Sequence, residues 1–375
     1  MGDQSTANCG LIAGPEARKV RMQKTKVLLA FTHKCHVVTT QVVTALLGST
    51  ISNAARLLRD LAEQGLMQEV NLRHCDRAPR GRGFMLKPDG VRAVAQDLPD
   101  KAHHYNCRPE SIKHDQLSHD LLLAELAAHW VQQGGALIHT DHTLRQLMPK
   151  GKLPDLILQW AGIKVAFEYE RLDKKVRELD QKLLAASEHQ RFATIWLSDI
   201  EGNLQHMAAR IMSAAVPIWR LSSAHKWCTD GEAYLPADFR CRQFLVSLKP
   251  DTLTRSPQAW IDDIKRHSAA MAAKCVSSLR DEGWSWGRTD PMTWRGEDIH
   301  QFHLQIDSAK VTGGFFVTHM GGDNWRVCDE SQTPDQGCGL ERACHWAPVH
   351  DAAPPIAVIE MAVRRIKHYN FKLPS

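Results

Sequence analysis

Three acidic residues lie in two consecutive segments that have the pattern of β-strands. In IKVAFEYE (163–170) apolar residues alternate with others, and this period of two places Glu168 and Glu170 on one face, about 7 Å apart along the strand. Asp155 follows a proline at the start of the preceding segment, LPDLILQW (153–160). Only an alanine and a glycine separate the two segments, so a tight turn would bring Asp155 within reach of the acidic face.

Three carboxylates at one place indicate a bound cation. Burying several carboxylates together is costly unless a cation neutralises them. Mg²⁺ or Mn²⁺ prefers oxygen ligands, and such an ion can also hold a phosphate oxygen and polarise a water molecule. We therefore predict that Asp155, Glu168 and Glu170 bind Mg²⁺ or Mn²⁺ in a metal-dependent nuclease.

The segments around these carboxylates alternate between strand and helix patterns. Short loops and this alternation predict an α/β core with a central sheet, within a chain that is α+β overall. We assign the core to residues 112–225 and a C-terminal α+β region without an assigned role to residues 240–375. The expected strands are 136–140, 153–160, 163–170, 193–199, 217–223 and 313–322, and the expected helices are 117–133, 173–187, 204–212, 261–279 and 355–369.

The N-terminal part, residues 1–96, has the pattern of a winged helix. A short helix is expected over residues 40–47, closed by Gly48, and a second helix follows from Ile51 to a stop at Gly65. An extended segment and a basic hairpin complete the pattern, with Phe84 on the returning strand.

Basic residues are concentrated in this N-terminal part. Residues 1–110 hold sixteen Lys or Arg against ten Asp or Glu, whereas the rest of the chain is close to neutral. This asymmetry predicts a polyanionic partner, with one helix in a major groove and the hairpin along the phosphate backbone. The predicted DNA contacts are Ser52, Asn53, Arg56, Arg59, Arg73, Arg77, Arg80 and Arg82. A winged helix used only for protein contacts is the alternative.

The acidic segments resemble the PD-(D/E)xK motif of restriction-endonuclease-like proteins. Pro154-Asp155 precedes Glu168-Tyr169-Glu170, and the expected order of elements matches the core of that fold. In that superfamily the aspartate and the first acidic residue bind the metal, and a lysine two positions on assists the attacking water. This chain has Glu170 at the lysine's position, so the resemblance assigns that role to Lys174 or Lys175, one helical turn later.

A further resemblance extends to the helix before the strands. The segments LSHDLLLAELA (117–127), LPDLIL and FEYERLDKK are similar to the replication-relaxation family, which includes the MobC-type relaxases of mobilisable plasmids. In that family a winged helix precedes an endonuclease-like domain with a His-Asp on its first helix, a Pro-Asp and an ExE followed by lysine. The resemblance covers roughly residues 35–220 and implies as catalytic residues His119, Asp120, Asp155, Glu168, Glu170 and Lys174.

The resemblance implies a nickase acting at a specific double-stranded site like an origin of transfer. Single-stranded DNA and accessory mobilisation proteins are further implied partners. Two other functions stay open, a non-catalytic replication or transcription regulator and a restriction-type defence nuclease. His119 is also compatible with a packed histidine, and Glu170 with Lys174 is compatible with a plain ion pair at a helix start. We expect a cytoplasmic protein, because no apolar run reaches the length of a membrane span.

Overall fold

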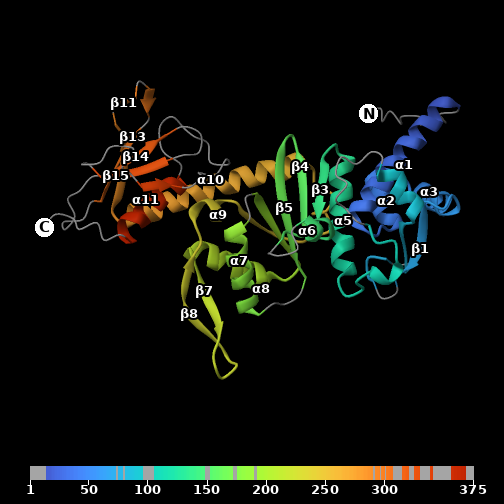
Figure 1. Cartoon of the computed structure of the whole chain (residues 1–375), viewed down its shortest axis with the longest axis horizontal. Helices are drawn as coiled ribbons and strands as arrows, with labels where there is room; N and C mark the ends of the chain where they lie inside the picture. The colour runs from blue at the N-terminus through green and yellow to red at the C-terminus, as the bar shows by residue number, and fades with distance from the viewer. Residues whose placement is uncertain are drawn as a thin grey trace, which may run out of the picture. The chain divides into compact units, whose positions relative to one another are not determined.

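The computed structural model shows a chain of mixed α/β type (Figure 1). It divides into two compact units, Met1–Ile163 with Pro250–Pro257 and Lys164–Lys249 with Gln258–Ser375. The three domains expected from the sequence stay a prediction, since a compact unit need not fold separately. The structure describes residues 14–72, 75–78, 81–95, 105–147, 153–171, 175–189, 192–289, 292–295, 297–299, 301–306, 315–320, 325–329, 338–340 and 356–368.

The first unit begins with four helices and a two-stranded sheet. In chain order these are α1 (Pro15–Cys35), α2 (Thr40–Leu47), α3 (Ile51–Glu63), β1 (Met67–Asn71), β2 (Arg82–Leu86) and α4 (Pro88–Ala95). The strands β1 and β2 are antiparallel, and Val38 forms an additional bridge to Phe84. The expected helix over 40–47 is confirmed to the residue, whereas α1 and α4 were not expected.

Local signals explain where α2 and α3 begin and end. Gly48 adopts φ 54° at the end of α2, a left-handed conformation that suits glycine. Thr50 caps α3, because its side chain accepts a hydrogen bond from the amide of Asn53 at 3.3 Å. Leu58 of α3 is buried, whereas Ile51 in the first turn is 62% exposed.

The rest of the first unit combines two helices with an antiparallel strand pair. These elements are α5 (Leu117–Gln132), β3 (Ala136–Thr140), α6 (Asp141–Leu147) and β4 (Leu156–Trp160). The side chain of Trp130 on α5 donates to the carbonyl oxygen of Gln159 at 2.9 Å, which ties this helix to β4. The helix α6 was not expected from the sequence. It begins where Thr140 and Thr143 exchange hydrogen bonds between side chain and backbone amide, at 3.0 and 3.4 Å.

The second unit contains three parallel strands flanked by helices. The elements are β5 (Ile163–Glu170), α7 (Val176–His189), β6 (Ala193–Ser198), α8 (Glu201–Ser213) and β9 (Gln243–Ser247). The strand β6 pairs in parallel with β5 and with β9. The expected sheet strand over 217–223 was wrong, since β7 (Ala215–Leu221) pairs antiparallel with β8 (Trp227–Tyr234) in a separate ribbon. Pro217 in β7 cannot donate a ladder hydrogen bond, which favours an edge position.

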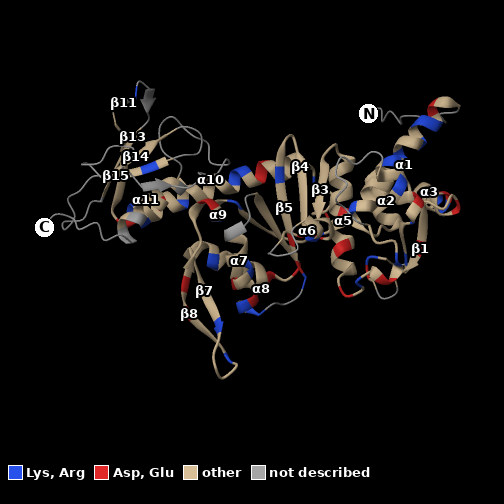
Figure 2. Ribbon diagram, in the orientation of Figure 1, with Lys and Arg blue, Asp and Glu red and all other residues tan. Residues whose placement is uncertain are grey.

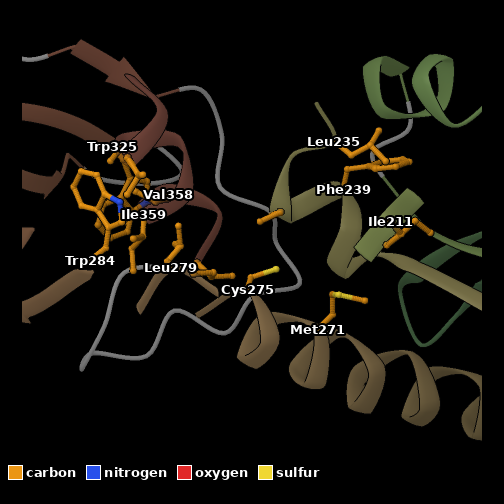
Figure 3. Packing of buried hydrophobic residues seen from close by; sticks show 14 of the residues in the cluster. Ile211, Leu235, Phe239, Met271, Cys275, Leu279, Trp284, Trp325, Val358 and Ile359 are labelled. Carbon is orange, nitrogen blue, oxygen red and sulfur yellow. The ribbon is translucent and has the colours of Figure 1, made fainter. Parts of the chain in front are cut away.

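One hydrophobic core runs through the second unit (Figure 3). It joins Phe239 and Met271 to Trp284, Trp325 and the helix α11. The elements that contribute beyond β9 are α9 (Ala237–Cys241), α10 (Pro257–Asp281), β10 (Trp284–Arg288), β13 (Gln301–Ile306), β14 (Phe315–His319), β15 (Trp325–Asp329), β16 (Cys338–Leu340) and α11 (Ile356–His368). The five strands form an antiparallel sheet, and β11 (Met292–Trp294) pairs with β12 (Glu297–Ile299) apart from it.

Three tryptophans in the described part of this region are buried. Trp260, Trp284 and Trp325 are each at most 3% exposed, which agrees with their role in packing. Within the described ranges, every helix is too short or too polar to span a bilayer.

Two helical glycines allow a matched test of the packing of α4. A Cβ added at Gly90 would lie 2.1 Å from the carbonyl oxygen of Leu66, whereas a Cβ at Gly202 in α8 would meet nothing within 4 Å. We expect Gly90→Ala to lower the free energy of unfolding by about 1–3 kcal/mol, because the backbone must shift. Gly202→Ala should leave it unchanged or slightly higher. Urea unfolding followed by circular dichroism measures both, and equal stabilities would contradict this packing.

Candidate functional site

The acidic face of β5 is buried and holds a lysine from α7. Glu168 and Glu170 are both 0% exposed. The ammonium group of Lys182 lies 2.9 Å from Oε2 of Glu168 and forms a second ion pair with Oε1 of Glu170. The two glutamates therefore share one ammonium group, which agrees with their common face on the strand; the predicted divalent ion stays a prediction.

The position of Lys182 follows from the packing of α7. Leu179, Leu183 and Ala186 are buried in the core, and Lys182 falls on the same stripe of the helix. Its ammonium lies 5.1 Å from the centre of the Trp196 ring, a favourable cation–π position. A charged group this deeply buried needs such partners, because an unpaired ion is strongly destabilising in the interior.

The carboxyl end of β5 is fixed by its neighbour β6. Ser198 donates its hydroxyl hydrogen to the carbonyl oxygen of Glu170 at 2.7 Å, and the amide of Ile200 donates to the Ser198 hydroxyl at 3.0 Å. Parallel strands present their carboxyl ends at one edge, which is where open α/β sheets bind ligands. The pair Glu168 and Glu170 thus occupies a favourable place for chemistry.

A second group of titratable side chains lies in the first unit. In the first turn of α5, His119 places Nδ1 3.1 Å from Oδ1 of Asp120 and Nε2 3.1 Å from Oδ2 of Asp155. The backbone of Asp155 is held in turn, because its carbonyl oxygen accepts a hydrogen bond from the amide of Asp141 at 2.8 Å. The structure therefore brings three of the predicted catalytic residues together around one imidazole.

The two carboxylates determine the charge of His119. Burial by itself lowers the pKa of this imidazole, but hydrogen bonds and charges from Asp120 and Asp155 outweigh the burial and raise the pKa to about 10. His119 is therefore an imidazolium at neutral pH. It can donate a proton or bind an anion there, and it becomes a base only in alkaline solution.

The two buried glutamates fit a magnesium-type ion by their donor chemistry. Mg²⁺ commonly takes one or two carboxylates from the protein and completes its shell with water and substrate phosphates. The carboxylates of Glu168 and Glu170 with the ammonium of Lys182 leave a formal charge of −1, which attracts a cation. Among the described residues, no group of three or more His, Cys, Asp or Glu side chains is placed to hold a metal ion. Asp155 as a third ligand stays a prediction.

The lysine expected near the carboxylates differs from the one observed. Lys174 lies outside the described residues, and Lys175 is exposed just before α7. Lys182 was missed by the sequence analysis. One signal could have found it, because Lys182 interrupts the apolar stripe formed by Leu179 and Leu183 in a helix that was correctly expected.

The predicted DNA contacts occupy different environments. Four of the predicted contacts lie on α3 and are exposed. Among them, Oδ1 of Asn53 accepts a hydrogen bond from Arg56 at 3.1 Å. Nε of Arg82 lies 3.3 Å from Oε1 of Glu69. Nη1 of Arg77 lies 2.9 Å from Oε2 of Glu125, so the charge of Arg77 is balanced within the protein. Further Lys and Arg residues follow one another along α1 (Figure 2). The exposed predicted contacts on α3 are Ser52, Asn53, Arg56 and Arg59, and the two predicted arginines outside the described residues are Arg73 and Arg80.

Two groups of side chains can therefore carry chemistry, the Glu168–Glu170–Lys182 cluster and the imidazolium of His119. Comparison of the chain with protein-family models, with curated proteins and with solved structures finds no match. The side chains of these two groups are therefore the basis for any function proposed for the chain.

The raised pKa of His119 leads to a prediction about pH. Asp155→Asn removes one carboxylate, so the pKa of His119 should fall from about 10 toward 6.5. Because the folded-state pKa is above the unfolded value, the extra stability of the wild type is fully present below pH 6.5 and is lost as the pH rises through 10. Histidine NMR titration and urea unfolding at several pH values measure the two effects. Asp115→Asn, at an exposed residue before α5, is the control, and an unchanged His119 titration would contradict the pairing.

The Glu168–Glu170–Lys182 cluster leads to a prediction about stability. Lys182→Met should lower the free energy of unfolding by about 3–5 kcal/mol, because two buried carboxylates lose their cation. Adding Glu168→Gln and Glu170→Gln in the same background should restore most of the loss. Urea unfolding of the full chain measures this, with Lys175→Met as the exposed control. A loss below about 1 kcal/mol, as for a surface pair, would contradict the pairing.

Proposed function

We propose that this chain is a metal-dependent DNA endonuclease that nicks a specific site, as its resemblance to the MobC-type relaxases implies. The observation that supports this proposal is the cluster of Glu168, Glu170 and Lys182 at the carboxyl end of β5. Two hard oxygen donors beside a buried ammonium are the side chains that phosphodiester hydrolysis needs.

Each residue of the proposal has a separate task. Glu168 and Glu170 would hold the cation, which when bound supplies Lewis-acid polarisation of the phosphate and of a water molecule. Lys182 would offset the negative charge that develops on the phosphate oxygens. The resemblance gave the lysine near the carboxylates, Lys174 or Lys175, a different task, that of assisting the attacking water. The imidazolium of His119, held by Asp120 and Asp155 in the first unit, is a separate group that is able to donate a proton.

We further propose that residues 15–95 form a winged helix that selects duplex DNA. The order of α1, the bridge at Val38, α2, α3, β1 and β2 supports this assignment. The helix α3 would enter the major groove with its exposed polar face, which includes Asn53 and Arg56. Arg82 on β2 would contact the phosphate backbone.

A non-catalytic DNA-binding protein is the second candidate. One observation favours it, because Lys182 by itself already neutralises much of the charge of the two glutamates. A purely structural ion pair would have the same contacts. This candidate predicts DNA binding without cleavage.

A nicking assay separates the two candidates. DNA fragments that the protein retains would first be selected and cloned into a supercoiled plasmid. The wild type should convert this plasmid to the nicked circle in Mg²⁺ or Mn²⁺. Glu168→Gln and Glu170→Gln should each reduce the rate by about a hundredfold or more, as does the loss of one transition-state partner in other enzymes.

The controls define what would contradict the assignment. Glu201→Gln, at an exposed glutamate in the first turn of α8, should cleave at the wild-type rate. Asp155→Asn tests the third predicted ligand in the same assay. Equal nicking by wild type and both glutamine variants would refute the assignment of the carboxylates, and a linear product would favour a restriction-type nuclease.

A further inference from the structure

The β7–β8 ribbon of the second unit presents an exposed tryptophan near its turn. The two strands are joined by residues 222–226, where the amide of Ser222 donates to the carbonyl oxygen of Lys226 at 2.9 Å. Figure 1 shows the ribbon extending beyond α7 and α8, with its turn at the far end. Leu221 and Trp227 are directly paired across the strands, so their side chains lie on the same face.

This face carries an unusual concentration of exposed apolar side chains. Leu221 is 51% exposed, Trp227 is 45% exposed, and Val176 at the start of α7 is 47% exposed. Arg177, next to Val176, lies with its guanidinium 4.2 Å from the centre of the Trp227 ring. Of the eight large apolar side chains exposed in the described part of the chain, two belong to this face, and a third, Val176, precedes the arginine that contacts it. Contiguous exposed apolar groups of this kind mark interaction sites.

The surroundings of the patch are basic. Lys175, Arg177, Arg220 and Lys226 are opposed by two acidic residues, each of them already paired with one of these arginines. Arg220 pairs with Asp230 at 2.8 Å, and Arg177 lies 3.6 Å from Glu178. The formal charge of the set is therefore +2, and basic residues are visible near the turn of the ribbon in Figure 2.

The ribbon is held to the helices beside it two residues before Leu221, so the patch has a defined position. Trp219 donates its indole hydrogen to Oδ2 of Asp180 at 3.0 Å. Asp180 is 0% exposed and also accepts hydrogen bonds from His206 and Arg210, both at 3.1 Å. This network joins α7, α8 and β7, which lowers the entropy lost when a ligand binds.

We propose that the patch of Val176, Arg177, Leu221 and Trp227, called here the ribbon patch, binds single-stranded DNA. An unpaired base stacks on Trp227, and Arg177 and Lys226 contact the flanking phosphates. Base stacking on an aromatic ring within a basic groove is the usual way in which proteins hold single strands. A duplex does not offer this contact, because its bases are stacked on one another.

This inference rests on the proposed function, the action of the chain on DNA, and adds that part of the bound DNA is single-stranded. The helix α7 carries both Arg177 of the ribbon patch and Lys182 of the carboxylate cluster, about 7.5 Å apart along its axis. One helix thus holds both groups, with Arg177 against the ribbon and Lys182 against the buried carboxylates. A nickase that opens its site needs such a grip on the released strand.

The test is a binding titration in the absence of metal. Fluorescence anisotropy of a labelled oligothymidylate would be measured with the full chain at several salt concentrations. Trp227→Ala should weaken binding about tenfold through the lost stacking, while Trp227→Phe should retain most of the affinity. Arg177→Gln should reduce the slope of affinity against salt. Met212→Ala, at a 48% exposed apolar residue of α8, is the matched control and should bind as the wild type does.

Further measurements separate this inference from the proposed nuclease. Duplex binding by Trp227→Ala should be unchanged, and its circular dichroism should match the wild type. The Glu168→Gln and Glu170→Gln variants should lose nicking but keep single-strand binding. Wild-type affinity for oligothymidylate in both Trp227→Ala and Arg177→Gln would overturn the inference, as would the absence of single-strand binding by the wild type, whatever the nicking assay shows.

Discussion

Burying two carboxylates side by side in a protein interior is expensive, and in this chain the expense is offset by a single lysine. Glu168 and Glu170 are both inaccessible to solvent, and Lys182 contacts both of them. Removal of Lys182 leaves two carboxylates without their cation in a medium of low dielectric. The same face of α7 carries this lysine and the buried Leu179 and Leu183, so the ion pairs and the apolar packing place the helix in the same orientation.

The helix α7 serves three regions of the second unit because its faces differ in chemistry. Leu179 and Leu183 anchor it in the core, and Lys182 beside them reaches the carboxylates. Asp180 accepts a hydrogen bond from Trp219 of the β7–β8 ribbon, while Arg177 stacks on Trp227. The proposed catalytic cluster and the ribbon patch are therefore held by the same fourteen-residue helix.

Features set by residues close in the sequence were predicted, whereas the pairing of strands distant in the sequence was not. The period of two in residues 163–170 was sufficient to predict β5 and the shared face of its glutamates, and turn signals located α2 and α5. The strand at 217–223 was assigned to the wrong sheet, because its apolar pattern does not say which strand it pairs with. The position beside β6 is taken by β9, which begins 45 residues after the end of β6 and reaches it through tertiary packing.

The sequence by itself determined the elements that carry the acidic residues, since side-chain periodicity within one element depends only on neighbouring residues. It also placed Asp155, Glu168 and Glu170 at the ends of strands. Only the tertiary structure decided that Lys182 neutralises the glutamates and that Asp155 holds His119 as an imidazolium. Both results depend on contacts between segments distant in the sequence, where burial and a partner's charge decide the state of a titratable group.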